Sequence, residues 1–214
     1  MYIPKQFDEP RVEALHALIE SHPLGSLVTM TGGGLEANHL PFELDPEPAP
    51  YGTLRGHVAR ANPVWQTYSS EVEALVIFQG AGEYITPSWY LSKREHGKVV
   101  PTWNYAVVHA YGALRVVEDR AWLRGLVERL TGRHEAGRAA PWAVTDAPAD
   151  FVESMLGAIV GVEIPLARLH GKWKVSQNRP AKDRESVVEG LTAERRESAT
   201  RMADLVRRAA TDGS

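Results

Sequence analysis

Apolar residues recur at intervals of three and four positions in four parts of the chain, and this spacing predicts amphipathic helices. In the first of these segments Leu15, Leu18 and Ile19 fall on one face, and Pro23 ends the pattern. The second segment begins after Asp119, which we expect to cap it because a carboxylate accepts hydrogen bonds from the free N–H groups of a first turn. The helices are expected at residues 8–22, 121–130, 151–159 and 192–210.

Shorter runs with β-branched, aromatic and alternating residues predict strands between these helices. Residues 24–31 and 35–42 flank three consecutive glycines and therefore predict a hairpin. Helices and strands do not alternate along the chain, which disfavours a doubly wound parallel sheet and favours a barrel of short antiparallel strands. The strands are expected at residues 24–31, 35–42, 53–58, 74–79 with a continuation at 84–85, 103–117 with a bend at Gly112, and 160–169.

Composition narrows the class of protein. The chain has 214 residues, 43% of them hydrophobic, which is enough for one cored domain with or without an appendage. It has no cysteine, so disulfides, thiol nucleophiles and cysteine-bound metals are excluded. No apolar run reaches the ~20 residues of a membrane span, and the N-terminus lacks the apolar centre of a signal peptide. We therefore expect a soluble, cytoplasmic protein with no membrane partner, and the net charge of −3 argues against direct DNA binding.

Four clusters combine polar and aromatic residues in a way that core packing does not require. They occupy residues 55–63, 84–90, 92–98 and 171–180, and the third leads directly into VVPTWNYAVVHAYG at residues 99–112. Hydroxyls and cations can bind a phosphate, and ring faces can flank a flat heterocycle, so the set predicts a phosphorylated, planar ligand. The alternative for each residue alone is a core aromatic or a solvated charge. The last cluster, with Lys-Trp-Lys, could also bind a polyanion.

Several catalytic and nucleotide-binding motifs are absent from the sequence. It contains no GxGxxG, GxxxxGK[ST], GxSxG or HExxH pattern, so we assign no catalytic residue and no metal ligand. The histidines are scattered, and His39, His57 and His109 would be the candidate ligands only if the protein bound heme.

The clusters resemble a known family. The blocks ANHLPFELD (37–45), LRGHVARANP (54–63), VIFQGAGEYITPSWY (76–90), KREHGKVVPTWNYAVVHAYG (93–112) and GKWKVSQNRP (171–180) closely resemble the PaiB-like family of FMN-binding negative transcriptional regulators. The resemblance implies a mainly β fold with flanking helices (α+β), an antiparallel split β-barrel of the FMN-binding type. It also implies a homodimer that binds FMN in the cleft between protomers. We expect this domain, with helical insertions, at residues 1–191, followed by an amphipathic helix and tail at 192–214.

On this resemblance the polar-aromatic clusters would bind FMN. Arg60, Ser88 and Lys93 would contact the phosphate. Trp89, Trp103 and Tyr105 would flank the ring, and Asn104 and Gln177 would offer hydrogen bonds to its polar edge. The full set of predicted cofactor-binding residues is His57, Arg60, Asn62, Ser88, Trp89, Tyr90, Lys93, Thr102, Trp103, Asn104, Tyr105, Lys174 and Gln177.

Two functions remain open beside a regulator that only binds FMN. One is an FMN-dependent oxidoreductase or flavin reductase that would use NAD(P)H, because the cofactor rather than the protein carries such chemistry. The other is a heme-binding relative. Direct DNA binding is doubtful, since residues 193–208 carry five arginines against three acidic residues and a clean apolar stripe, which favours a docking helix.

Overall fold

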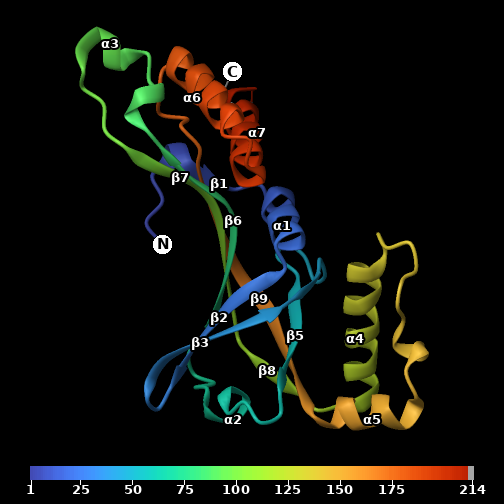
Figure 1. The fold of residues 1–214 in the computed structure, drawn as a ribbon. Helices are drawn as coiled ribbons and strands as arrows, with labels where there is room; N and C mark the ends of the chain where they lie inside the picture. The colour runs from blue at the N-terminus through green and yellow to red at the C-terminus, as the bar shows by residue number, and fades with distance from the viewer. Residues whose placement is uncertain (212–214) are drawn as a thin grey trace. The chain divides into compact units, whose positions relative to one another are not determined.

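The computed structural model describes residues 1–211, and its strands form a mainly antiparallel sheet (Figure 1). Neighbouring strands follow the order β3-β2-β6-β7-β9-β5-β4, while β1 and β8 also pair with β9. The strands are β1 (Asp8–Glu9), β2 (Leu24–Thr31), β3 (Gly34–Pro41), β4 (Glu43–Asp45), β5 (Thr53–Ala59), β6 (Ala74–Ile85), β7 (Thr102–Gly112), β8 (Arg115–Val117) and β9 (Ile159–Lys174).

Helices precede, interrupt and follow this sheet. No helix within residues 1–211 combines the length and the apolar character that a membrane span requires. The α-helices are α1 (Val12–Ser21), α2 (Val64–Thr67), α3 (Ser92–His96), α4 (Arg120–Glu135), α5 (Ala149–Gly157), α6 (Ala181–Ala193) and α7 (Glu197–Thr211). Short 3-10 turns are η1 (Lys5–Phe7), η2 (Pro87–Trp89) and η3 (Val144–Asp146).

The chain folds into two compact units, which we describe separately. The first unit comprises residues 1–18, 79–108 and the described chain from residue 170 on. The second unit comprises residues 19–78 and 109–169. Strands β6, β7 and β9 contribute residues to both units.

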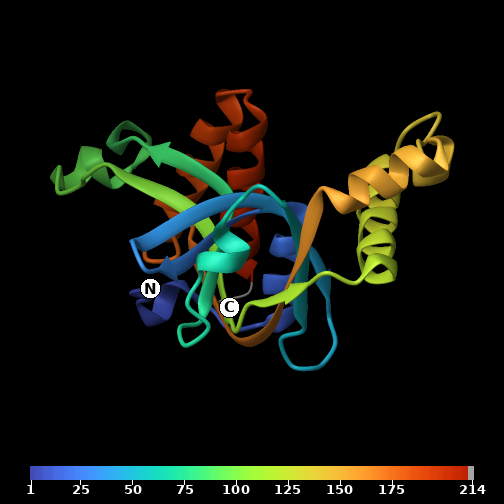
Figure 2. The same cartoon turned by 90° about the horizontal axis from the view of Figure 1, so that it is seen from below.

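The core of the first unit is formed by the ends of long strands and by the two C-terminal helices. Helices α6 and α7 lie side by side in both views (Figures 1 and 2). The apolar stripe predicted for the last helix is confirmed, because Ala199, Met202 and Val206 are buried against Ile85 and Leu191. The helix therefore docks on the protein with its charged face outward, as its sequence pattern indicates.

The second unit contains the predicted hairpin and a separate helical core. Strands β2 and β3 pair from Leu24 with Pro41 to Thr31 with Gly34, so the glycine turn is confirmed. Asp119 caps α4 as predicted, since its carboxylate accepts a 2.7 Å hydrogen bond from the N–H of Trp122. Helices α4 and α5 pack through a small apolar cluster of their own (Figure 2).

Three predicted boundaries were wrong for identifiable reasons. The first helix begins at Val12, because residues 8 and 9 instead pair as β1 with the end of β9. The strand predicted at 160–169 runs from Ile159 to Lys174, so the Lys-Trp-Lys sequence is β-structure. The helix predicted at 192–210 begins at Glu197, as α7, because the chain turns at Arg195, which adopts a positive φ of 54°. Residues 192 and 193 end a separate helix, α6, which was not predicted.

The predicted strand at 103–117 is also divided, at the glycine where a bend was expected. Strand β7 ends at Gly112, and β8 resumes at Arg115. A Cβ atom on Gly112 would lie 2.2 Å from the carbonyl oxygen of Pro165, so only glycine permits this close approach of two backbone segments.

Candidate functional site

Strand β7 opens with the sequence Thr-Trp-Asn-Tyr, and alternation separates these side chains onto two faces. Asn104 is only 1% exposed, and its Nδ2 donates a 2.9 Å hydrogen bond to Oγ of Ser176. Trp103 is 58% exposed and meets the Tyr84 ring edge-on, with 6.1 Å between centroids. One face of the strand therefore completes the first unit's core, while the other presents indole and phenol rings.

Cations gather beside these rings at the end of β9. The ammonium of Lys174 donates to Oγ1 of Thr102 and, at 2.5 Å, to the carbonyl oxygen of Trp103. Nζ of Lys172 lies 5.4 Å from the centroid of the Tyr105 ring and donates a 3.1 Å hydrogen bond to the carbonyl oxygen of Tyr2. These two lysines are two positions apart on one strand and so point to the same side of it.

The third cation, Arg179, follows in the turn after β9. Its guanidinium carbon lies 4.6 Å from the centroid of the Tyr90 ring. Within residues 1–211 none of Lys172, Lys174 and Arg179 forms an ion pair with a carboxylate. Burial, and then the positive charges of Lys172 and Arg179, lower the pKa of Lys174. Partly buried cations that repel one another and form no ion pair form an arrangement that binds an anion well.

The turn between β9 and α6 is held by its own polar side chains. Gln177 accepts a 2.8 Å hydrogen bond from the N–H of Val175 through Oε1 and donates through Nε2 to the carbonyl oxygen of Trp173. Ser176, the partner of Asn104, is 3% exposed and adopts a φ of 68°. A non-glycine residue in this left-handed conformation is held there by its surroundings, which is common at functional sites.

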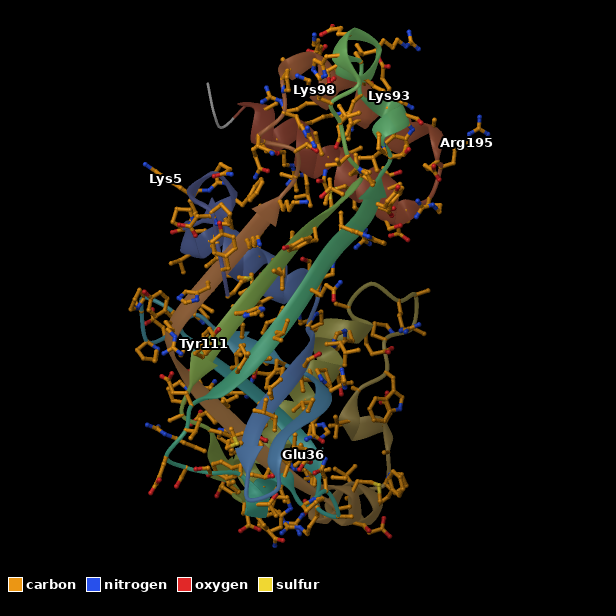
Figure 3. All side chains as sticks on the ribbon, turned by 90° about the vertical axis from the view of Figure 1, so that its left-hand side faces the viewer. Lys5, Glu36, Lys93, Lys98, Tyr111 and Arg195 are labelled. Carbon is orange, nitrogen blue, oxygen red and sulfur yellow. The ribbon has the colours of Figure 1, made fainter. Side chains whose placement is uncertain are left out.

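The predicted residues between β6 and β7 lie on η2, on α3 or between the two, also in the first unit. Oγ1 of Thr86 accepts from the N–H of Ser88, and Nζ of Lys93 lies 3.4 Å from Oγ of Ser88. Tyr90 is 1% exposed, and burial raises the pKa of its phenol although Arg179 opposes the effect. Lys93 and Lys98 extend from the α3 end of this unit (Figure 3). The first unit thus holds every predicted FMN-binding residue from the segments at 84–105 and 171–180.

The remaining three predicted residues lie in the second unit and have partners there. Burial lowers the pKa of His57, so its imidazole is neutral near pH 7 and brings no charge to a phosphate. Arg60 donates to Glu118 at 2.6 Å and to two backbone carbonyl oxygens. Asn62 donates to Asn38 at 2.7 Å and accepts from the N–H of Val64. A ligand role for these three residues stays a prediction.

Sequence reasoning missed three residues that the structure brings to the cation cluster or its support. Lys172 could have been found if the predicted strand had been extended to Lys174, because residues two positions apart on a strand point to the same side of it. Arg179 and Ser176 could not, since a turn gives no periodic signal. Ser176 depends on a contact with Asn104, 72 positions away in the sequence.

The chain matches a family model and several known proteins over most of its length. The family model described as "Putative FMN-binding domain" matches residues 1–168. The protein is 35% identical over 209 residues to "Protease synthase and sporulation protein PAI 2" of Bacillus subtilis, with 96% of each chain covered. It is also 35% identical to an uncharacterised protein of Emericella nidulans, with 89% of this chain and 90% of the relative covered.

Solved structures show the same fold at low sequence identity. The flavocytochrome Anf3 of Azotobacter vinelandii matches with a TM-score of 0.58 and 13% identity, covering 80% of this chain and 72% of that one. The FAD and heme binding protein of Mycobacterium smegmatis matches with a TM-score of 0.57 and 17% identity, covering 78% and 73%. The split-barrel fold predicted from the sequence is confirmed.

Proposed function

The chain belongs to the FMN-binding family whose model matches its residues 1–168, and from this membership we propose that FMN is held by the first unit of a homodimeric, regulatory protein. The bound cofactor supplies a ring that can exchange electrons. The protein binds and orients that ring and its phosphate, and no residue is assigned to catalysis.

One observation carries this proposal: three partly buried cations without ion-pair partners in the described chain lie among aromatic residues of the first unit. Lys172, Lys174 and Arg179 provide the positive charge, and Trp103 and Tyr105 provide the flat surfaces. FMN has the matching chemistry, since it joins a phosphate to a planar heterocycle. The donor set therefore fits the cofactor that the family implies.

The predicted roles divide within this unit. Ser88 and Lys93, which contact each other, would bind the phosphate together with Lys174. Trp89, Trp103 and Tyr105 would flank the ring. Asn104 and Gln177 already bond Ser176 and the adjoining backbone, so in our proposal they hold the turn that carries Arg179. The role of Arg60 and the boundary at residue 191 stay predictions, and residues 212–214 of the predicted tail lie outside the described part.

A second copy of the chain is the proposed occupant of the apolar surface around Trp103. Trp103, Tyr84 and Val100 are 58%, 47% and 63% exposed, although they belong to the same unit. A copy seated there would exclude water from the rings, as in the dimer cleft that the resemblance implies.

Arginines at the start of and along the last helix form ion pairs, which does not favour direct DNA binding by this chain. Arg196 at its start pairs with Glu83 and Glu194, while Arg201 pairs with Glu197 and Arg207 with Asp204. The acidic partners reduce the net positive charge that this helix could offer to DNA phosphates. We therefore propose that any transcriptional effect passes through a protein partner, and cytoplasmic location stays a prediction.

Titration of the purified chain with FMN and with riboflavin, followed by flavin fluorescence, tests the proposal. We expect saturable binding of both, tighter for FMN, and a shift from monomer to dimer in sedimentation velocity as FMN is added. Failure of FMN to saturate the chain below about 1 mM would overturn the proposal. NADPH and NADH oxidation by the loaded protein, well above that of free FMN, would instead favour the oxidoreductase.

A further inference from the structure

Helix α6 lies beyond residue 168, where the family model ends, yet it holds the segment that carries four predicted ligand residues. That segment connects β6 to β7 and contains η2 and α3. Its backbone at Ser92 donates a 2.9 Å hydrogen bond to Oδ1 of Asp183, and the Ser92 hydroxyl donates to Oδ2 at 2.6 Å. Ser92 and Asp183 are 5% and 1% exposed, so both bonds are shielded from water.

Further contacts between α6 and the segment surround this buried pair. Nζ of Lys182 binds the carboxylate of Glu95 at 2.5 Å. The Ser186 hydroxyl donates to the carbonyl oxygen of Trp89, and the Trp89 ring packs directly on Gly190. The side chains that contact the segment come from successive turns of α6, and they reach both η2 and α3.

The segment cannot fix its own geometry. Its two helical pieces have three and five residues, and such short helices are unstable without tertiary contacts. Ser88 and Lys93 lie on these pieces, on either side of Tyr90, and Lys93 directly follows Ser92. What holds Ser92 therefore helps to set the position of Lys93 and, through the contact between Lys93 and Ser88, that of Ser88.

Two hydrogen-bond donors of Ser92 and two nearby cations favour the ionised form of Asp183. Burial alone would raise the pKa of this carboxyl, but the hydrogen bonds from Ser92, followed by the charges of Lys182 and Arg179, lower it. Asp183 is thus ionised near pH 7, and an anion with two buried donors makes stronger hydrogen bonds than a neutral acceptor.

We propose that Asp183 is a positioning residue for FMN binding, in that its carboxylate holds Ser92 so that Ser88 and Lys93 face the cofactor's phosphate. The inference rests on the proposed FMN site in the first unit. In this proposal Asp183 contacts the segment and does not touch the cofactor itself. Residues after 168 are then part of the cofactor site, although the family model does not include them.

Three variants of the full chain separate this role from general stability. Asp183→Ala removes both acceptors, and Asp183→Asn keeps one acceptor and places an amide that can donate to the Ser92 hydroxyl. Glu185→Ala is the matched control, because it removes an exposed carboxylate from the same helix, two positions away. Should Asp183→Ala fail to fold, Ser92→Ala removes the hydroxyl bond and leaves the backbone bond in place.

The first readout is the ratio of riboflavin to FMN dissociation constants, which isolates the phosphate contribution. We expect Asp183→Ala to lower this ratio about tenfold, Asp183→Asn to restore most of it, and Glu185→Ala to leave it within about twofold of wild type. A folded Asp183→Ala variant with the wild-type ratio would overturn the inference, while a wild-type chain that binds neither flavin overturns the proposed function instead.

The second readout needs no flavin. Trypsin can cleave after Lys93, Arg94 and Lys98, which are exposed residues of the segment. We expect cleavage at these sites to be several-fold faster in apo Asp183→Ala than in wild type or Asp183→Asn. Equal cleavage rates in all three proteins would show that Asp183 does not hold the segment, whatever the flavin result.

Discussion

Gly190 is the position where a single methyl group should disturb the proposed site most predictably. It lies in α6 against the indole of Trp89. A Cβ atom there would lie 2.4 Å from Cδ2, 2.5 Å from Cε2 and 2.6 Å from Cγ of that ring. Carbon atoms pack at ~3.5–4.0 Å, so in Gly190→Ala the ring has to move by about 1 Å. The indole is rigid, and Ser186 holds the carbonyl of the same residue.

Two effects of opposite sign determine the stability of this variant. Alanine is favoured over glycine in a helix interior by about 1 kcal/mol. Overpacking a filled site costs about 1–3 kcal/mol. Gly132→Ala in α4 is the matched control, because its added Cβ meets nothing within 4 Å. It gains the propensity without the clash, so the difference between the two variants isolates the overpacking cost.

Urea unfolding of both variants, followed by tryptophan fluorescence, measures this difference. We expect Gly190→Ala to be about 1–3 kcal/mol less stable than Gly132→Ala. FMN affinity should also fall in Gly190→Ala, because the displaced indole belongs to the segment that carries Ser88. Equal free energies of unfolding for the two variants would show that Trp89 does not occupy this place in solution.

Further predictions concern the charges of the first unit. Lys174→Met keeps the length of the side chain and removes its charge. In a fluorescence titration we expect its FMN affinity to fall about tenfold, while its riboflavin affinity changes little. The control variant Lys5→Met, at an exposed lysine, should bind both flavins as wild type does. Equal losses for both flavins would contradict a phosphate role. Glu83→Ala should lower the free energy of unfolding, measured in urea, by about 1–2 kcal/mol. The buried carboxylate of Glu83 accepts two hydrogen bonds of 2.9 Å from the guanidinium of the half-exposed Arg196, and the substitution removes both. The native pKa values of Glu83 and Asp183 are lowered by their hydrogen bonds, even though burial opposes the shift. Their stabilisation is therefore present above the unfolded-state values of about 4 and is lost as pH falls through the native values, so wild type should lose more stability between about pH 5 and 2 than Asp183→Ala. Parallel acid curves would refute that assignment.

Local patterns predicted the parts of the fold that depend on local physics. The cap at Asp119 follows from one carboxylate placed just before an apolar-periodic run. The stripe of α7 follows from the spacing of Ala199, Met202 and Val206. The hairpin follows from three glycines between two apolar runs. Each of these features is specified within about 20 residues of sequence.

The parts that were missed depend on partners far along the chain. The end of β9 carries lysines and a tryptophan, and it is a strand because its backbone pairs with Asp8 and Glu9. The sequence of α6 has few apolar residues, and its buried Asp183 gives no hydrophobic signal. The bond between Ser92 and Asp183 joins residues 91 positions apart, so no local pattern could reveal it. The residue types of the candidate site could therefore be proposed from the sequence, whereas the contacts that support them could not.

A crystal structure of the chain with bound FMN tests the central claim most directly. We predict that the phosphate lies within hydrogen-bond distance of Lys174 and of Ser88 or Lys93, and that the ring lies against Trp103 or Tyr105. The map would contradict the account if it placed FMN in the second unit alone, around Arg60 and His57, with no contact to Lys172, Lys174 or Arg179.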